Sequence, residues 1–509
     1  MELLELKDKM LSLLDTDIEN ISFAINNVLK NKEEREKIFE KYNLLVKGDL
    51  ETDNLQKIWQ YYHADRKEKC QDYTPKSIAK LCAILTRTNG SVCYDLCAGS
   101  GALTIQKWAD NKSKQFICEE LDEKVFPLLL FNMCIRNMAG YAICRNALTL
   151  DFSFGYKLEK GKNFSEISEI TEAPKIEADE VISNPPYNIQ WDPPAPLFAD
   201  SRFQKCEVPP ARNANWAFVL TAIDRMSDFG KCAFILPCGF LSNEEEKEQR
   251  KWAITNGLIK KVIALPDGMF ESTGIPTCVI LFEKSEHVEF YDARKSGTKE
   301  LRLQNGQVGS ASHKNRTYKK ELTIISDDVI DKLSKCTSDA SLLSAIKTKD
   351  EIQKKDWILV PSRYIEYPSE EIEHRKLSEI MSDINKVSRE RSSIKLTINE
   401  TLAKQLGLYE IAELEKNSDA TELNKTFNAL GGKYISKQYI QLSKNKNEIK
   451  FESNDKEMLS SIFSILIPMW KQHVFYLNQQ ENILLSELRD AMLPDLMSGK
   501  ICFSEKTNE

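Results

Sequence analysis

The tetrapeptide NPPY at Asn184–Tyr187 combines side chains that could act on an aromatic amine. Its prolines fix the backbone, so the side-chain oxygen of Asn184 and the carbonyl of Pro185 are held in a rigid turn. These oxygens could accept both hydrogens of an exocyclic amine, while the ring of Tyr187 stacks on the base that carries it. An ordinary proline turn is the alternative, but the segment directly follows an expected strand, Val181–Ser183, where an open parallel sheet binds its ligand. We therefore predict a catalytic site made of Asn184, Pro185, Pro186 and Tyr187.

A second segment, Asp95–Gly101 with the sequence DLCAGSG, lies between an expected strand and an expected helix. Gly99 and Gly101 let the backbone turn tightly and approach a ligand, and the amides at the start of a helix attract carboxylates. Glu120 follows at the end of the next expected strand, where a carboxylate can bind both hydroxyls of a ribose. Because the chain has neither a GxGxxG fingerprint nor a phosphate-binding lysine, a nucleoside without a pyrophosphate fits better than a dinucleotide.

Between residues 71 and 325, short apolar runs that favour strands alternate with helical stretches. The expected strands are Ser91–Leu96, Gln115–Cys118, Tyr141–Cys144, Glu180–Ser183, Cys232–Leu236, Val262–Leu265 and Cys278–Phe282. Helices are expected, for example, at Leu128–Met138 and Trp216–Met226. This alternation indicates an α/β fold with a mostly parallel sheet and helices on both of its faces. We interpret the charged segment Gly155–Pro174 as a surface insertion.

Helical patterns flank this region on both sides. Residues 1–70 carry apolar side chains three or four positions apart and contain no glycine before Gly48. Beyond residue 369 an apolar seam with heptad-like spacing is interrupted only by Arg391. Its members are Leu377, Ile380, Ile384, Val387, Ile394 and Ile398. A second seam follows Pro468, which prevents a continuous helix, so two helices could pair in antiparallel order. This second seam consists of Trp470, Val474, Leu477, Leu484 and Leu488.

The composition excludes several classes of protein. Of the 509 residues, 41% are hydrophobic and 29% are charged, which is typical of a globular protein and excludes wholesale disorder. No apolar run approaches the ~20 residues that span a bilayer, and the acidic start does not resemble a signal peptide. The 13 cysteines form no CxxC pair and only five histidines occur. We therefore expect reduced thiols, a cytoplasmic protein without membrane contact and no metal site.

The order of these motifs resembles that of a known enzyme family. DLCAGSG, an acidic residue at the end of the next strand and NPPY are similar to the class I S-adenosylmethionine-dependent DNA adenine methyltransferases of the gamma arrangement. More specifically, the chain resembles the modification (M) subunit of type I restriction-modification systems over about residues 55–368. Gln71–Pro75 resembles the Q-x-[YF]-T-P cofactor segment of these subunits, and residues 265–281 resemble the stretch that closes their catalytic domain. Trp357–Tyr364 is similar to a segment just after that domain.

The resemblance implies a class I methyltransferase (Rossmann-like) fold. It also implies transfer of a methyl group from S-adenosylmethionine to N6 of a flipped adenine in double-stranded DNA. The cofactor-binding residues that it implies are Asp72, Tyr73, Thr74, Pro75, Asp95, Ala98, Gly99, Ser100, Gly101, Glu120 and Asn146. Asn146 occupies a position where the family often has an aspartate near the adenine, so its role stays open. We interpret the proline-rich segment Gln190–Asn215 as a loop that closes over the flipped base.

We expect four parts in the chain. These are an N-terminal helical region (1–70), a catalytic domain (71–325), a connecting segment (326–368) and a helical tail for subunit docking (369–509). The terminal segment Glu487–Ile501 resembles the C-terminal element of type I specificity (S) subunits, with a helix that simply ends at Gly499 as the alternative.

Partner subunits are expected because the net charge of −7 disfavours unaided binding to DNA. We expect a hetero-oligomer in which two copies of this chain flank one specificity subunit or a pair of half-length ones. The sequence leaves open whether a restriction (R) subunit joins them, and which DNA sequence is recognised.

Other functions compete with this interpretation. The chain could be a self-sufficient adenine DNA methyltransferase with recognition built into its C-terminal region. A catalytically inactive DNA-binding module would be expected to lack Asn184 or Gly99, and both are present. A protein-glutamine methyltransferase also uses an NPPY-type motif, but the helical tail and the segment Thr273–Thr277 argue against it.

Overall fold

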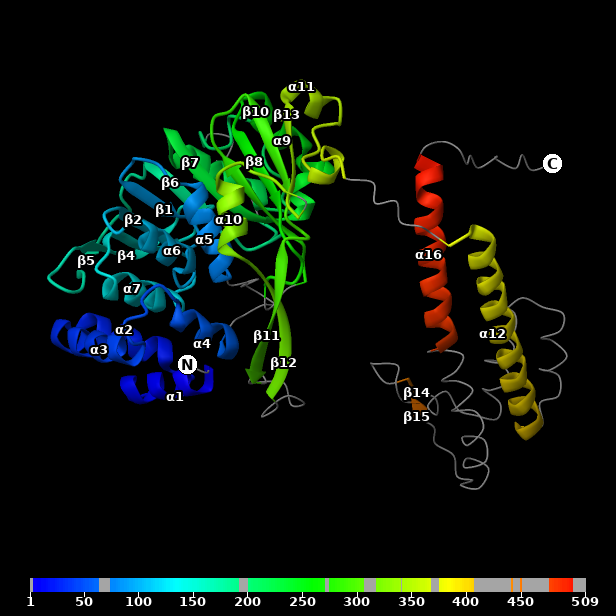
Figure 1. Ribbon diagram of the computed structural model, residues 1–509. Helices are drawn as coiled ribbons and strands as arrows, with labels where there is room; N and C mark the ends of the chain where they lie inside the picture. The colour runs from blue at the N-terminus through cyan, green and yellow to red at the C-terminus, as the bar shows by residue number, and fades with distance from the viewer. Residues whose placement is uncertain are drawn as a thin grey trace. The chain divides into compact units, whose positions relative to one another are not determined.

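The computed structural model describes residues 3–63, 74–191, 200–270, 274–305, 317–339, 341–367, 375–406, 441–442, 449–450 and 476–497. The chain forms two compact units, Met1–Pro368 and Ser369–Glu509 (Figure 1). Among the described residues, no helix is long and apolar enough to cross a membrane.

The first unit is built on a sheet that has eleven strands in the described part of the chain. In spatial order these are β13 (Leu343–Thr348), β10 (His287–Asp292), β8 (Ile259–Ala264), β9 (Thr277–Phe282), β7 (Met226–Pro237), β6 (Ala178–Ser183), β1 (Val92–Asp95), β2 (Gln115–Glu120), β3 (Ala139–Arg145), β4 (Phe152–Glu159) and β5 (Glu166–Ile170). The central strands β7, β6, β1, β2 and β3 are mutually parallel, whereas β9 lies antiparallel between β7 and β8. The predicted α/β fold with a mostly parallel sheet is confirmed, and every predicted strand overlaps an observed one.

Helices cover both faces of this sheet (Figure 1), because side chains alternate between the faces along each strand. In β2, Phe116 and Cys118 face one hydrophobic core and Ile117 faces another. The first core contains residues of α5 (Lys76–Leu85), α6 (Ala102–Asp110), α7 (Phe126–Ile135) and α10 (Asp327–Ser334). The second core contains residues of α8 (Asn215–Arg225), α9 (Lys247–Thr255) and α11 (Lys349–Gln353).

The N-terminal residues form helices that extend the first core. They are α1 (Leu3–Leu14), α2 (Ile21–Lys30), α3 (Lys32–Leu45) and α4 (Asn54–Tyr62). The ring of Phe39 in α3 packs edge-to-face on Phe131 in α7, with centroids 4.8 Å apart. The predicted helices are therefore present, and they share one hydrophobic core with the sheet.

The segment Gly155–Pro174, which we interpreted as a surface insertion, is part of the main sheet. It contains most of β4 and all of β5, a hairpin that extends the sheet beyond β3. Phe154, just before the segment, packs on Phe126 of α7 with centroids 5.0 Å apart. The interpretation was wrong because a hairpin at the edge of a sheet keeps part of its surface in solvent, so its sequence stays rich in charged residues.

A separate ribbon and several single-turn helices complete the first unit. The ribbon is made of β11 (Gly297–Asn305) and β12 (Thr317–Ile325), which are antiparallel. The single-turn 3₁₀ helices are η2 (Cys238–Leu241), η3 (Glu244–Glu246) and η4 (Pro361–Arg363).

The second unit contains two long helices that run antiparallel. They are α12 (Leu377–Leu406) and α16 (Asn478–Met497). The same unit contains two short strands, β14 (Gln441–Leu442) and β15 (Ile449–Lys450), which pair with each other. Arg375 lies 3.5 Å from Glu487, and Arg391 pairs with Glu481, so residues later in the first helix meet residues earlier in the second. The expected antiparallel order is present.

The members of the α12 seam whose side chains are described, Leu377 to Ile394, are buried or half-buried. Ile380 on α12 and Leu477, just before α16, are both buried. Arg391 interrupts the seam because it forms an ion pair across the two helices. Of the second predicted seam, Trp470 and Val474 lie outside the described residues.

Candidate active site

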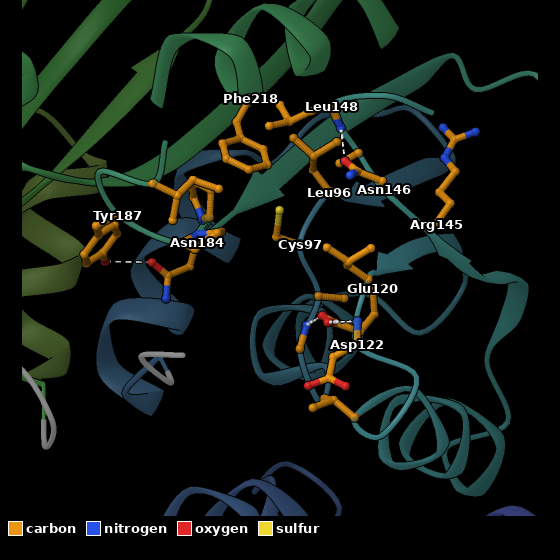
Figure 2. Close-up of a pocket in the computed structure, with 18 of the residues that line it drawn as sticks. Leu96, Cys97, Glu120, Asp122, Arg145, Asn146, Leu148, Asn184, Tyr187 and Phe218 are labelled. Carbon is orange, nitrogen blue, oxygen red and sulfur yellow. Dashed lines mark hydrogen bonds between the residues drawn. The ribbon is translucent and has the colours of Figure 1, made fainter. Parts of the chain in front are cut away.

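A cavity of about 800 Å³ opens at the carboxyl ends of the central strands β1, β2, β3 and β6 (Figure 2). The predicted site residues that line it are Thr74, Ala98, Gly99, Ser100, Glu120, Asn146, Asn184, Pro185, Pro186 and Tyr187. The structure therefore brings the glycine-containing turn and the NPPY segment, more than eighty residues apart in sequence, to one site. Pro75, Asp95 and Gly101 do not line this cavity, and Asp72 and Tyr73 lie outside the described residues.

The turn between β1 and α6 forms one wall of the cavity. Gly99 and Gly101 have φ angles of 57° and 98°, which side chains with a β carbon rarely adopt. The helix that follows begins at Ala102, and the amide of Gly101 donates to the carbonyl of Ala98 at 2.8 Å. This hydrogen bond closes the turn, and the backbone of the turn forms part of the cavity wall.

Asp95 lies behind this turn at the end of β1. Its Oδ2 accepts a hydrogen bond from Thr104 Oγ1 at 2.8 Å, whereas Oδ1 is buried and has no hydrogen-bond partner among the described residues. Burial raises the pKa of Asp95 to about 7. A buried carboxylate oxygen of this kind suits a cationic amine as its partner.

Of the two neighbouring acids at the end of β2, Glu119 and Glu120, it is Glu120 that faces the cavity. Its Oε2 accepts from the amide of Gly99 at 2.8 Å, and its Oε1 accepts from the amide of Asp122 at 2.8 Å. Desolvation raises the pKa of Glu120 to about 7. The neighbouring Glu119 points to the opposite face of the sheet, where it pairs with Arg225 at 3.1 Å. The alternation along β2 thus distinguishes the two acids.

The carboxamide of Asn184 is oriented by a hydrogen bond at each of its ends. Its Nδ2 donates to Thr74 Oγ1 at 2.9 Å, and its Oδ1 accepts from the hydroxyl of Tyr187 at 2.7 Å. The ring of Tyr187 is only 6% exposed and meets Phe270 edge-to-face, with centroids 6.4 Å apart. Figure 2 shows Asn184 and Tyr187 facing each other on one side of the cavity, with Glu120 and Asp122 on another.

Asn146 lies at the rim, just after β3. Its side-chain oxygen accepts from the amide of Leu148 at 2.9 Å and from that of Thr149 at 3.3 Å. Asn146 therefore shapes the loop that lines the cavity beyond β3.

The segment interpreted as a base-covering loop is anchored at its described ends. Trp191 donates from its backbone amide to the carbonyl of Ala211 at 2.9 Å, and from its ring to the carbonyl of Pro210 at 3.0 Å. Trp191 itself lines the cavity. The two ends of the loop are thus held together beside the NPPY segment, and residues 192–199 lie outside the described part of the chain.

Sequence reasoning missed several lining residues. Among them are Leu121, Asp122, Leu148 and Phe218, which lie outside the predicted motifs. Phe218 belongs to the apolar helix α8, where nothing in the pattern separates a cavity residue from a core residue. Asp122, two positions after Glu120, could have been found as a second polar residue beyond the end of the same strand.

The residues present fit a nucleoside that carries a charged amino-acid arm. Glu120 offers carboxylate oxygens suited to ribose hydroxyls, and Leu121 and Leu148 offer apolar surface for a base. Backbone at Gly99 lies along the wall, and Asp95 supports this turn from behind through its bond to Thr104. Among the described residues, no group of three or more His, Cys, Asp or Glu side chains could hold a metal ion.

Comparison with known proteins agrees with this chemistry. Residues 47–374 match the sequence model of the family described as N-6 DNA methylase. The chain is 24% identical over 383 residues to the type I restriction enzyme HindI methylase subunit of Haemophilus influenzae, covering 70% of this chain and 78% of that protein. It is 24% identical over 352 residues to the MjaIX methylase subunit of Methanocaldococcus jannaschii, covering 65% of this chain and 58% of that protein.

Among solved structures, the chain is similar to a type I restriction-modification methyltransferase subunit from Streptococcus thermophilus. The identity is 21% and the TM-score is 0.49, with 70% of this chain and 80% of that chain covered.

Proposed function

The chain belongs to the N-6 DNA methylase family, and from this premise we propose that it is the modification subunit of a type I-like restriction-modification complex. It transfers a methyl group from S-adenosylmethionine to N6 of adenine in DNA. One observation supports the proposal above all: Asn184 and Glu120 line the same cavity at the carboxyl ends of the strands.

In this proposal, different residues bind different parts of S-adenosylmethionine. Glu120 accepts hydrogen bonds from the ribose hydroxyls, and Leu121 and Leu148 contact the base. Asp95 does not line the cavity, so in this proposal it supports from behind the turn that holds the methionine arm, through its bond to Thr104. S-adenosylmethionine supplies an electrophilic methyl group on a sulfonium.

Asn184 and Pro185 act on the adenine. The target amine lies inside the duplex, so the base must be flipped into the cavity at a cost of a few kcal/mol. Asn184 Oδ1 and the Pro185 carbonyl then accept the two amine hydrogens and draw its lone pair out of conjugation. The hydroxyl of Tyr187 already donates to Asn184 Oδ1, and the second lone pair of this oxygen accepts from the amine. Stacking of the Tyr187 ring on the base would return ~1–3 kcal/mol.

Partner subunits follow from the relatives and from the surface of the second unit. The relatives are named as methylase subunits of type I restriction enzymes. In the α12–α16 pair, Met381, Ile483 and Leu485 are exposed apolar side chains, which suit docking on another protein. We place two copies of this chain on one specificity subunit in the cytoplasm, where the complex binds double-stranded DNA. The self-sufficient alternative is not favoured, because these relatives are subunits.

The function is tested by purifying the chain alone and together with a candidate specificity subunit. Each preparation is incubated with tritiated S-adenosylmethionine and DNA, and the DNA is then digested and analysed for N6-methyladenine. We expect N6-methyladenine at one sequence motif with the partner and little without it. Absence of transfer to adenine in both preparations would overturn the enzymatic assignment, and robust methylation at one motif by the chain alone would overturn the subunit assignment.

A further inference from the structure

Asp53, which lies far from the predicted motifs in sequence, reaches the cofactor turn. It precedes α4, and its Oδ1 accepts from the amide of Gln56 at 2.9 Å, so it caps that helix. Its Oδ2 accepts from Ser100 Oγ at 2.7 Å, and its Oδ1 also accepts from Asn132 Nδ2 at 3.0 Å. Asp53, Ser100 and Asn132 are all buried. One carboxylate of the N-terminal helices thus binds the turn that forms the cavity wall.

The contact with Ser100 is reinforced on its other side. Asn132 Nδ2 also donates to the carbonyl of Ser100 at 2.8 Å, so both the side chain and the backbone of this residue are held. Arg136 donates to Asn132 Oδ1 at 2.8 Å, which fixes the orientation of the asparagine amide. Arg136 also donates to the carbonyl of Leu50 at 2.7 Å, close to the start of α4. The position of the turn is therefore set by a connected buried network.

The same helix reaches the catalytic amide by a second route. Gln56 lies in the first turn of α4, and its Nε2 donates to the carbonyl of Thr74 at 3.2 Å. Thr74 Oγ1 in turn accepts from Asn184 Nδ2 at 2.9 Å. The start of one short helix is thus connected to both halves of the cavity, directly to the cofactor turn through Asp53, and to Asn184 through Gln56 and Thr74.

An ordinary helix cap makes none of these additional contacts. Asn31 caps the neighbouring helix α3 by accepting from the amide of Glu34 at 3.2 Å, and among the described residues it forms no hydrogen bond with the cofactor turn. A cap alone needs only that backbone bond. Capping α4 therefore does not require the additional hydrogen bonds that Asp53 accepts from Ser100 and Asn132.

We propose that Asp53 and Gln56 are positioning residues, which place the cofactor turn and the catalytic Asn184 respectively from the N-terminal helical region. The inference rests on the proposed function, because it concerns the geometry of that same site. It assigns to α4 the role of setting the distance between the bound cofactor and the groups that hold the adenine amine.

The test replaces Asp53 by residues that separate the cap from the contact with the turn. Serine is a preferred cap but is too short to reach Ser100, so Asp53→Ser should keep α4 while losing the contact. We expect about tenfold weaker binding of S-adenosylmethionine by calorimetry on the full chain. Asp53→Asn keeps the shape and an acceptor oxygen and should bind within about threefold of the wild type. Asn31→Ser is the matched control and should leave the affinity unchanged.

Gln56→Ala tests the second route. It should leave the affinity for S-adenosylmethionine within about twofold and lower kcat by about fivefold or more in the methylation assay with the partner. Wild-type affinity in Asp53→Ser would overturn the role of Asp53, and wild-type kcat in Gln56→Ala would overturn that of Gln56. If Asp53→Ser does not fold, Ser100→Ala removes the same bond from the other side, and unchanged affinity there would equally overturn the proposal. Failure of the wild type to bind S-adenosylmethionine would instead contradict the proposed function.

Discussion

Glu120 combines a structural contact with a titration near neutral pH. Its carboxylate accepts from the amides of Gly99 and Asp122, and desolvation raises its pKa to about 7, against ~4.3 for a free glutamate. The folded protein without cofactor therefore favours the protonated form. The stability that Glu120 contributes is present at acidic pH and is lost as the pH rises through about 7.

Cofactor binding should have the opposite dependence on pH, because ribose hydroxyls donate to the ionised carboxylate. We expect the affinity for S-adenosylmethionine to rise about tenfold between pH 6 and pH 8, with release of protons on binding. Calorimetry in buffers of different ionisation enthalpy measures both effects. Glu120→Gln should flatten the dependence and weaken binding by ~1.5–3 kcal/mol. A flat profile in the wild type would show that another group holds the ribose.

Asn184 should affect turnover and not cofactor affinity. Its oxygen acts on the adenine amine, so Asn184→Ala should lower kcat by roughly 100-fold or more, as loss of a transition-state hydrogen bond does elsewhere. Affinity for S-adenosylmethionine should stay within about twofold. Tritium transfer and calorimetry measure the two quantities. Asn111→Ala, at the far end of α6, is the control with wild-type values, and near-normal transfer by Asn184→Ala would reject the assignment.

At the scale of elements, β3 packs closely against β2, the strand that positions Glu120 at the cavity. Gly140 in β3 has a φ of +137°, and a β carbon there would lie 2.0 Å from the carbonyl oxygen of Phe116 in β2. The strand that ends at Glu120 is therefore packed against a position that tolerates only glycine.

Gly140→Ala should lower the free energy of unfolding by roughly 3 kcal/mol or more, because the backbone must move to admit the methyl group. Chemical denaturation followed by tryptophan fluorescence measures the change. Gly239→Ala is the matched control, since no atom lies within 4 Å of a β carbon at that position. Equal stability of the two variants would contradict the close approach of the strands.

At the scale of the whole molecule, the cavity and the helix pair that we propose for subunit docking belong to different units. Every residue that lines the cavity lies in the first unit, whereas the antiparallel helices α12 and α16 form the second. The net charge of −7 disfavours unaided binding to DNA, so we expect such binding to be weak in physiological salt.

A chain that ends at Tyr367 should therefore bind S-adenosylmethionine within about twofold of the full chain, because it keeps all the described residues that line the cavity. It should fail to associate with a specificity subunit in size-exclusion chromatography with light scattering, and should methylate little DNA. Stable association of the shortened chain would place the docking surface in the first unit.

The sequence by itself determined the order of the strands along the chain, the turn at Asp95–Gly101 and the NPPY turn. These features depend on local properties, namely the apolar periodicity of strands and the backbone requirements of glycine and proline. The heptad-like spacing after residue 369 likewise predicted a helix pair, because the seam repeats within each helix.

Only the tertiary structure showed that Glu120, as predicted, lines the cavity while Glu119 pairs with Arg225 on the opposite face, because the face that each side chain occupies depends on how β2 lies within the sheet. It also decided that Gly155–Pro174 joins the sheet, and that Asp53 holds Ser100, 47 residues away in sequence. The local sequence around these residues does not indicate that they form such long-range contacts. They arise when separate elements pack, since a buried polar group must then find its partner wherever the fold brings one.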